Sequence, residues 1–312
     1  MTATAPRHIT GEQLPELVGY PDAIVALESA FARLREYGDV ARKHLHMPGG
    51  ELLLMPAYGP EGVGVKLVTL NPANPDQGLP LIHGMYVMFA PGTLVAEATV
   101  DGAALTAVRT AAVSALATDR LARPDASRLV VFGAGAQAAA HIDAVCAVRP
   151  IEQVTIVGTG SPRTHRLCHT LRARGLRCDL GEPADVARAD IICTCTTSRT
   201  PLFDGGQVGP GVHVNVIGAY RPDMREVDGT LLAGARVVVE TRASALAEAG
   251  DVILAIAEGR LAETDLIELP EVVSGTAGRE GDDEVTVFKS VGLALEDLVV
   301  VRAALDRLAA LR

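Results

Sequence analysis

Apolar positions near the N-terminus follow first a helical and then a strand-like spacing. Residues 22–37 carry apolar side chains three to four positions apart, at Ile24, Leu27, Phe31 and Leu34. This spacing predicts an amphipathic helix, which Asp22 would cap. Short apolar runs broken by Gly and Pro follow, namely ELLLMPAY, GVGVKLVTL, LIHGMYVMFA and TLVAEATV. Runs of this length, separated by turn residues, predict an antiparallel sheet.

The pattern changes after Asp101. Residues 104–122 are rich in Ala and other good helix formers, which predicts a long helix leading into a second domain. Beyond it, continuous apolar strands alternate with helical segments, and residues 290–312 predict a final long helix. Alternation of this kind is typical of a parallel sheet covered on both faces. We therefore predict an α/β fold, a doubly wound Rossmann sheet with a separate α+β domain.

Composition and charge exclude several classes of protein. A chain of 312 residues suits two domains, and 48% hydrophobic with 21% charged residues indicates a folded protein. The net charge of −10, with five Phe, five Tyr and no Trp, argues against nucleic acid as a partner. No apolar run reaches the roughly 18–20 residues of a membrane span, and the N-terminus lacks the apolar middle of a signal peptide. We expect no membrane partner and a cytoplasmic location.

The cysteines give no sign of a metal site. There are five of them, an odd number, and none forms a C-x-x-C pair. Neither a disulfide framework nor a zinc site is therefore indicated. We expect most of these thiols to be small core residues.

The stretch LVVFGAGAQA, residues 129–138, reads as a strand, a glycine turn and the start of a helix. Its Gly133-x-Gly135-x-x-Ala138 spacing is the dinucleotide fingerprint with Ala at the third position. The first glycine permits a tight turn, and the second lets the backbone approach a pyrophosphate at the helix N-terminus. The residues expected to contact the cofactor here are Gly133, Gly135, Ala136 and Gln137. The alternative is a Gly-rich turn in an unrelated α/β unit.

The residues after the next strand bear on the choice of cofactor. An NAD enzyme usually has an acidic residue about 20 positions after the fingerprint, where it bonds the ribose 2′-hydroxyl. The strand VTIV is instead followed by Thr159, Ser161 and Arg163. Hydroxyls and an arginine suit a 2′-phosphate, so we predict NADPH, with NADH as the alternative. An exposed Arg163 without a selective role is the other interpretation.

The chain as a whole resembles the ornithine cyclodeaminase and mu-crystallin family over nearly its full length. The matching segments agree in order and spacing, and they are GVGVKLVTLNPANPDQGLP, DGAALTAVRTAAVSALATDRLAR, FGAGAQA, ADIICTCT, NVIGA with REVD, EAGD and FKSVGLALEDL. The resemblance implies a homodimer whose first domain supplies the substrate site and the subunit contacts. We expect that domain to comprise residues 1–118 joined by 286–312, and the Rossmann domain to comprise residues 119–285.

Three basic residues match family positions that hold the substrate carboxylate, namely Arg42, Lys66 and Arg109. A guanidinium binds a carboxylate bidentately, and a lysine supplies both charge and a transferable proton. Without the resemblance, Lys66 would be an outward-facing strand lysine. The two arginines would then be surface salt-bridge residues.

Further residues match positions near the substrate or the cofactor. Those beside the substrate are Met55, Val291 and Gly292, the last two in a loop that closes over it. Thr110 resembles a residue near the nicotinamide or its phosphates. Thr197 and Ile217 end later strands, where ligands of such sheets bind. Each of these residues also has a purely structural interpretation as a core, helix or loop residue.

Two positions depart from the ornithine cyclodeaminases. Those enzymes have an acid/base aspartate two residues after the glycine that matches Gly218, and this chain has Tyr220 there. An unperturbed phenol has a pKa of about 10 and is a poor base at neutral pH. Leu53 replaces a glutamate that would meet a second amine. Both changes disfavour oxidative deamination of a diamine and leave Tyr220 a hydrogen-bonding or packing role beside the substrate.

The pattern GA-x-RPD-x-RE-x-D is more similar to mu-crystallin and the bacterial ketimine reductases of the family. The implied reaction is NAD(P)H-dependent reduction of the cyclic imines Δ1-pyrroline-2-carboxylate and Δ1-piperideine-2-carboxylate to proline and pipecolate. One alternative is an ornithine or lysine cyclodeaminase or an alanine dehydrogenase-type enzyme. Another is a non-enzymatic NADPH-dependent binding protein.

Overall fold

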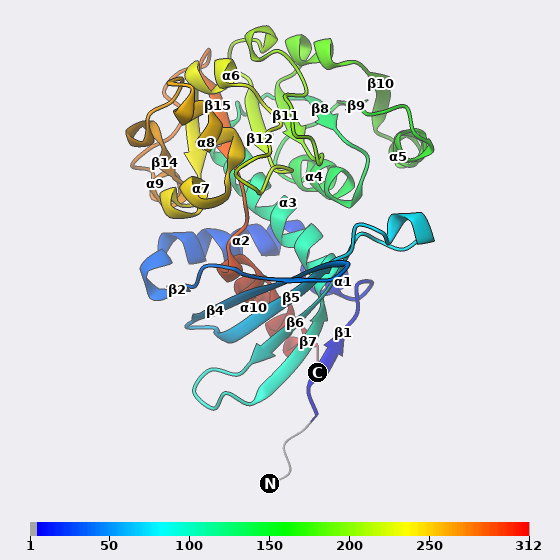
Figure 1. Cartoon of the computed structure of the whole chain (residues 1–312), viewed down its shortest axis with the longest axis vertical. Coiled ribbons are helices and arrows are strands. Elements are labelled where there is room, and N and C mark those ends of the chain that lie inside the picture. Colours follow the sequence, from blue (N-terminus) through cyan, green and yellow to red (C-terminus); the bar gives the residue numbers. More distant parts are fainter. Residues whose placement is uncertain (1–4, 312) are drawn as a thin grey trace. The chain divides into compact units, whose positions relative to one another are not determined.

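The protein forms two compact units in the computed structural model, which describes residues 5–311. The first unit comprises Met1–Ala112 and Leu293–Arg312, and the second comprises Val113–Gly292. Figure 1 shows the elements of both. The first boundary falls within helix α3 (Gly102–Leu121).

The first unit is built on a seven-stranded sheet in the order β1-β7-β6-β5-β4-β2, with β3 paired to β4. β1 and β7 are parallel and the other neighbours antiparallel, so the predicted antiparallel sheet is confirmed. The strands are β1 (Arg7–Ile9), β2 (Gly38–Asp39), β3 (Lys43–Met47), β4 (Gly50–Gly59), β5 (Gly62–Leu70), β6 (Ile82–Phe89) and β7 (Ala96–Asp101). The other helices are α1 (Leu14–Leu17), α2 (Tyr20–Ala32) and α10 (Ala294–Ala310), with 3₁₀ turns at Leu34–Glu36 and Pro75–Gln77.

Helix α2 begins two residues before the predicted start. Gly19 is the N-cap, and Pro21 lies in the first turn, where its fixed φ and missing N–H are tolerated. Asp22 therefore lies within the first turn, where its charge complements the helix dipole, and the prediction that it caps the helix is wrong.

One face of the first sheet is buried by helices. Every second residue of β4 and β5 is buried, because successive side chains of a strand point to opposite faces. Helix α10 contacts β4, β5, β6 and α2, and Figure 1 shows it in red along the sheet. Lys66 belongs to the buried set and is 1% exposed. It is therefore not an outward-facing strand lysine.

The second unit is an eight-stranded parallel sheet in the order β10-β9-β8-β11-β12-β15-β13-β14. Its strands are β8 (Arg128–Phe132), β9 (Gln153–Val157), β10 (Arg177–Gly181), β11 (Ile191–Thr194), β12 (His213–Val216), β13 (Ala235–Val239), β14 (Ile267–Glu268) and β15 (Val285–Lys289). Its helices are α4 (Ala136–Cys146), α5 (Pro162–Ala173), α6 (Gly229–Ala233), α7 (Arg242–Glu248), α8 (Gly250–Ala257) and α9 (Leu269–Val273), with 3₁₀ turns at Pro183–Arg188, Gly205–Gln207 and Glu263–Asp265. The strand order reverses between β8 and β11, which is where such sheets bind ligands.

Helices cover both faces of this sheet. Leu129 and Val131 of β8 pack into a core with α4 and α5, whereas Val130 and Phe132 pack into a second core with α6, α7 and α8. Neighbouring residues of one strand thus belong to opposite cores. The predicted doubly wound architecture is confirmed.

Strand β15 changes the expected C-terminal boundary. It pairs in parallel with both β12 and β13, inside the sheet of the second unit. The assignment of residues 286–292 to the first domain is therefore wrong, because this strand obtains its backbone hydrogen bonds from the second unit before α10 begins. At the other boundary the units divide after Ala112, earlier than the expected residue 118.

Two buried histidines predict that acid destabilises the second unit. Burial lowers the pKa of His141 to about 4 and that of His213 to about 3. Both stay neutral in the folded unit but protonate below about pH 6.5 in the unfolded chain, so their contribution to stability is lost as the pH falls through that value. We expect the free energy of unfolding, measured in urea, to fall by about 2 kcal/mol per histidine between pH 7 and pH 5. In a His141→Gln variant about half of this pH dependence should disappear, and equal stability of the native chain at both pH values would contradict the prediction.

Candidate active site

A group of buried charged side chains lies on the covered face of the first sheet. The Nζ atom of Lys66, on β5, is 2.9 Å from Oδ1 and 2.8 Å from Oδ2 of Asp297, in the first turn of α10. Arg109, on α3, donates from Nη1 to Oε2 of Glu296 at 2.7 Å, and its Nε is 3.4 Å from Oδ1 of Asp297. These four side chains are at most 6% exposed. Two predicted cations thus share two buried carboxylates.

The two carboxylates were missing from the sequence prediction. Glu296 also accepts a hydrogen bond from the N–H of Leu293 at 3.1 Å, so it helps to start α10. Acidic residues in a first helical turn also complement the helix dipole. The only hint in the sequence was therefore two adjacent acidic residues at the start of an apolar helix. Helix capping alone accounts for such residues, whereas the structure shows them bonded to cations 187 and 231 residues away in sequence.

Other predicted residues of the first unit lie around this group. Met55 pairs across the sheet with Lys66 and is buried on the same face. Arg42, half-buried just before β3, is near enough for its charge to lower the pKa of Lys66. Thr110 follows Arg109 in α3 and is buried. The expected carboxylate-binding residues thus gather in one part of the first unit.

Burial and neighbouring charges change the acidity of Lys66. Burial, followed by the charge of Arg109, lowers the pKa of Lys66 to about 8, although Asp297 acts in the opposite direction. Such a lysine is mostly protonated at pH 7 and yields its proton more readily than an ordinary one. The ion pairs of the group set two cations, Lys66 and Arg109, against the carboxylates of Glu296 and Asp297, so these four side chains balance in charge.

The second candidate site is the carboxyl edge of the parallel sheet. Gly133, after β8, has φ +109°, and a Cβ there would lie 2.6 Å from the carbonyl oxygen of Cys195, so this turn requires glycine. Gly135 is the N-cap of α4, which continues through Ala136 and Gln137. A Cβ on Gly135 would meet no described atom within 4 Å. Open space at a helix N-terminus is what a pyrophosphate needs, so these residues fit a dinucleotide.

The polar residues after β9 are accessible. Thr159 and Arg163 are exposed, and Ser161 is the half-buried N-cap of α5, with its Oγ 3.3 Å from Oγ1 of Thr164. The three side chains precede or open one helix. They could meet a phosphate group at that helix start.

The turns after β11 and β12 carry the remaining predicted residues of this edge. Thr197 is exposed after β11, and Ile217 is 8% exposed at the end of β12. Tyr220 is half-buried, and the guanidinium carbon of Arg221 lies 5.8 Å from the centre of its ring.

Glu240 anchors the loop that contains Val291 and Gly292, and sequence reasoning missed it. Its carboxylate, at the end of β13, is 1% exposed. It accepts hydrogen bonds from Ser290 Oγ at 2.6 Å and from the N–H groups of Val291 and Gly292, both at 2.9 Å. The loop after β15 is therefore tied to the neighbouring strand.

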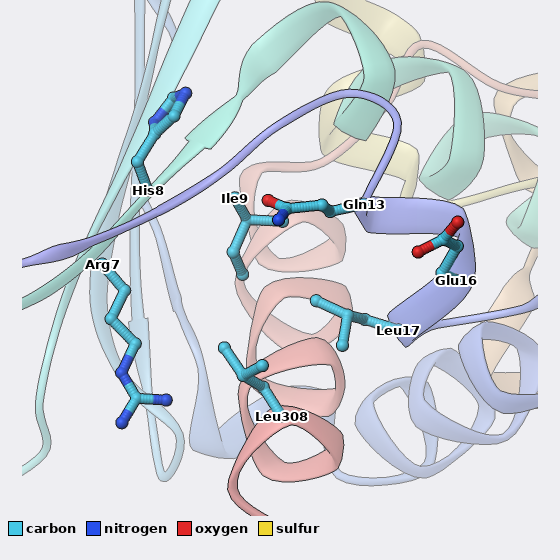
Figure 2. A pocket seen from close by; sticks show the side chains of 7 residues that line it. All are labelled: Arg7, His8, Ile9, Gln13, Glu16, Leu17 and Leu308. Atoms are coloured by element: carbon cyan, nitrogen blue, oxygen red, sulfur yellow. The ribbon is translucent and has the colours of Figure 1, made fainter. Parts of the chain in front are cut away.

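A pocket of the first unit contains none of the predicted site residues. Figure 2 shows its lining side chains, which come from β1, from α1 and the residue before it, and from α10, namely Arg7, His8, Ile9, Gln13, Glu16, Leu17 and Leu308. Its polar side chains are at least partly exposed. Among residues 5–311, no group of three His, Cys, Asp or Glu side chains could hold a metal ion. No helix in the same range is long and apolar enough to cross a membrane.

Known proteins are similar to this chain over most of its length. The model of the ornithine cyclodeaminase/mu-crystallin family matches residues 12–311. A Δ(1)-pyrroline-2-carboxylate reductase of Bacillus cereus is 38% identical over 263 residues, covering 80% of this chain and 79% of that protein. The structure of Thermococcus litoralis Δ(1)-pyrroline-2-carboxylate reductase with NADH and L-proline matches with a TM-score of 0.92 and 31% identity, over 97% of this chain and 98% of that one. An archaeal alanine dehydrogenase dimer with bound NAD matches with a TM-score of 0.91 and 29% identity, over 98% and 96%.

Removal of Asp297 should destabilise the first unit. In Asp297→Ala the buried ammonium of Lys66 loses its partner, which should lower the free energy of unfolding by roughly 3–5 kcal/mol in urea at pH 7. The double variant Lys66→Met/Asp297→Leu removes both charges and should recover most of that loss. A decrease of less than about 1 kcal/mol in the single variant would show that the pair is not coupled as the geometry indicates.

Proposed function

Because the chain belongs to the ornithine cyclodeaminase/mu-crystallin family, we propose that it reduces cyclic ketimines with a nicotinamide cofactor. The substrates would be Δ1-pyrroline-2-carboxylate and Δ1-piperideine-2-carboxylate, and the products proline and pipecolate. The observation that carries this proposal is the buried group in which Lys66 and Arg109, two of the cations predicted to hold a carboxylate, lie together. The Bacillus cereus and Thermococcus litoralis reductases support it, the latter with NADH and proline bound.

The first unit would hold the substrate by its carboxylate. Arg42 and Arg109 would bind the two oxygens, which fixes the ring and the C2 atom next to the carboxylate. Lys66, held by both oxygens of Asp297, would donate a proton to the ring nitrogen or keep it protonated. Its pKa of about 8 makes this transfer easier than from an ordinary lysine. A protonated imine accepts hydride far more readily than a neutral one.

The second unit would hold the cofactor, whose reduced nicotinamide supplies a hydride when bound. Gly133, Gly135 and the start of α4 would receive the pyrophosphate. We propose NADPH as the preferred form, because residues 158–163 offer hydroxyls and Arg163 but no carboxylate. Arg163 would pair with the 2′-phosphate.

Two residues favour reduction over oxidative deamination. Leu53 is 5% exposed and packs with Val68 and Leu70, so it offers nothing to a second amine. Tyr220 stands where a deaminase needs an acid/base carboxylate. The similarity to an archaeal alanine dehydrogenase supports the second candidate, oxidation of a small amino acid.

The deciding experiment compares steady-state rates for both cyclic imines, each with NADPH and NADH, against alanine and ornithine with the oxidised cofactors. We expect kcat/KM for an imine with NADPH to exceed that for either amino acid by at least about 100-fold. Arg163→Ala should reduce the preference for NADPH by about tenfold, since one charge-assisted contact is lost. Lys66→Met should lower kcat/KM for the imine by about 100-fold or more, with cofactor affinity unchanged.

The same assays give a different result for each alternative function or cofactor. Conversion of ornithine to proline with release of ammonia would overturn the reductase proposal, and efficient NADH formation from alanine would establish the second candidate. A preference for NADH that Arg163→Ala leaves unchanged would contradict the choice of NADPH. Full activity of Lys66→Met would show that Lys66 does not supply the proton.

We also propose a homodimer formed through the open face of the first sheet. Leu54, Leu67 and Met85 make a cross-strand row on the face opposite Lys66. Met85 is 46% exposed and the other two are half-buried. A contiguous, partly exposed apolar face is typical of an association surface. The matched archaeal alanine dehydrogenase is a dimer.

Sedimentation equilibrium should therefore give twice the chain mass of 32.5 kDa. Met85→Glu should shift the protein toward the monomer, because it places a charge on the apolar face. Val25→Glu, at a 65% exposed position on α2, is the matched control and should leave the mass unchanged. A monomeric native chain would contradict the proposal.

A further inference from the structure

Glu226 connects two turns at the carboxyl edge of the second sheet. Its side chain is 0% exposed. Oε1 accepts hydrogen bonds from the N–H and the Oγ1 of Thr196, both at 2.7 Å. Oε2 accepts from Oγ1 of Thr194 at 2.8 Å and from the N–H of Gly218 at 2.5 Å. One carboxylate therefore binds the end of β11, the turn after β11 and the turn after β12.

These two turns also touch backbone to backbone. A Cβ on Gly218 would lie 1.8 Å from the carbonyl oxygen of Thr196 and 2.6 Å from Oε1 of Glu226, so this approach requires glycine. The N–H of Ile217 donates to the carbonyl oxygen of Thr194 at 3.1 Å. A displacement of one turn must therefore displace the other.

A buried ion pair holds the same turn from its other side. Lys289 donates from Nζ to the carbonyl oxygen of Ala219 at 2.5 Å, and the Nζ is 3.0 Å from Oδ2 of Asp251. Oδ1 of Asp251 in turn accepts from the N–H groups of Glu226 and Val227, at 2.6 and 3.0 Å. The segments REVD, EAGD and FKSVG, far apart in the sequence, thus meet around the backbone that precedes Tyr220.

A carboxylate fits these donors better than an amide would. Each oxygen of Glu226 accepts two hydrogen bonds, whereas a glutamine has one acceptor oxygen and an NH₂ group that only donates. Bonds to an ionised acceptor are also the stronger kind. A buried charge is costly unless it is fully hydrogen-bonded, and here the four bonds satisfy it at the edge where ligands of such sheets bind.

We propose that Glu226 is a positioning residue, which holds the turns after β11 and β12 in the arrangement that binds the nicotinamide cofactor. Thr197 adjoins Thr196, and Ile217 adjoins Gly218, so the two residues expected along the cofactor are direct neighbours of the anchored ones. The inference rests on the proposed function, because it concerns the cofactor site of that reaction.

The test measures cofactor affinity, by isothermal titration calorimetry with NADPH and with NADH, in the full-length chain. Glu226→Gln should raise the Kd by about tenfold or more, and Thr196→Val by about threefold or more. Thr196→Ser keeps the hydroxyl and should bind like the native chain. Asp190→Asn is the matched control. Asp190 is 5% exposed and accepts from the N–H groups of Ser127 and Arg128 at the opposite, amino edge of the sheet.

Asp190→Asn should lower the midpoint of thermal unfolding and leave the Kd within about twofold of the native value. In the reductase assay, Glu226→Gln should raise the KM for the cofactor more than it lowers kcat. An unchanged Kd in Glu226→Gln, or an equal loss of affinity in Asp190→Asn, would overturn the inference. If Glu226→Gln does not fold, the Thr196 variants decide, and equal affinities of Thr196→Val and Thr196→Ser would overturn it.

These outcomes separate the inference from the proposed function. A native chain that binds the cofactor but reduces neither imine refutes the function, and the Kd series still decides the role of Glu226. Conversely, a native chain that reduces imines while Glu226→Gln binds the cofactor normally keeps the function and refutes the inference.

Discussion

The carboxylate of Asp297 holds the ammonium of Lys66 inside the first unit, and neither charge could be buried there without the other. This pair makes the start of α10 part of the proposed substrate site. Helix α10 has to begin where its first turn delivers Glu296 and Asp297 to Arg109 and Lys66. The same helix then covers the buried face of the sheet. The position of α10 therefore determines both how the first unit packs and how its buried charges are paired.

Buried charged side chains also fix the turns of the second unit. Glu226 and Glu240 are buried carboxylates whose oxygens bond to backbone N–H groups beyond the ends of strands, and Lys289 and Asp251 form a buried pair behind one of those turns. Such groups are costly to bury unless they are hydrogen-bonded or paired with an opposite charge, so their bonds to the backbone hold the surrounding turns in place. The turns that we expect to contact a cofactor are thereby already fixed in the protein. Binding then has a smaller entropy cost, because fewer loop residues must become ordered.

The two units offer different chemistry to a ligand. In the first unit, ion pairs with Asp297 and Glu296 fix Lys66 and Arg109, the cations that would hold a substrate carboxylate in the proposed reaction. In the second unit, open space above Gly135 and the start of α4 suit a pyrophosphate without the need for a buried cation. A reduction that needs a fixed carboxylate, a proton and a hydride donor uses both arrangements. A deamination would need a base where Tyr220 stands.

The sequence by itself determined those features whose signal lies within a short segment. Local patterns predicted both sheets and the dinucleotide fingerprint. These patterns are the short apolar runs separated by Gly and Pro, the apolar strands that alternate with helical segments, and the strand–glycine–helix order at residues 129–138. The predicted cations Arg42, Lys66 and Arg109 came from the family resemblance, and their burial together could not be read from spacing. Only the tertiary structure decided which carboxylates accompany them, because Lys66 and Asp297 are 231 residues apart and long-range pairing leaves no periodic trace. For the same reason, only the tertiary structure placed β15 between β12 and β13 and joined Glu226 to two turns. Backbone groups of a strand and buried charged side chains obtain their hydrogen-bond partners only when segments distant in sequence come together.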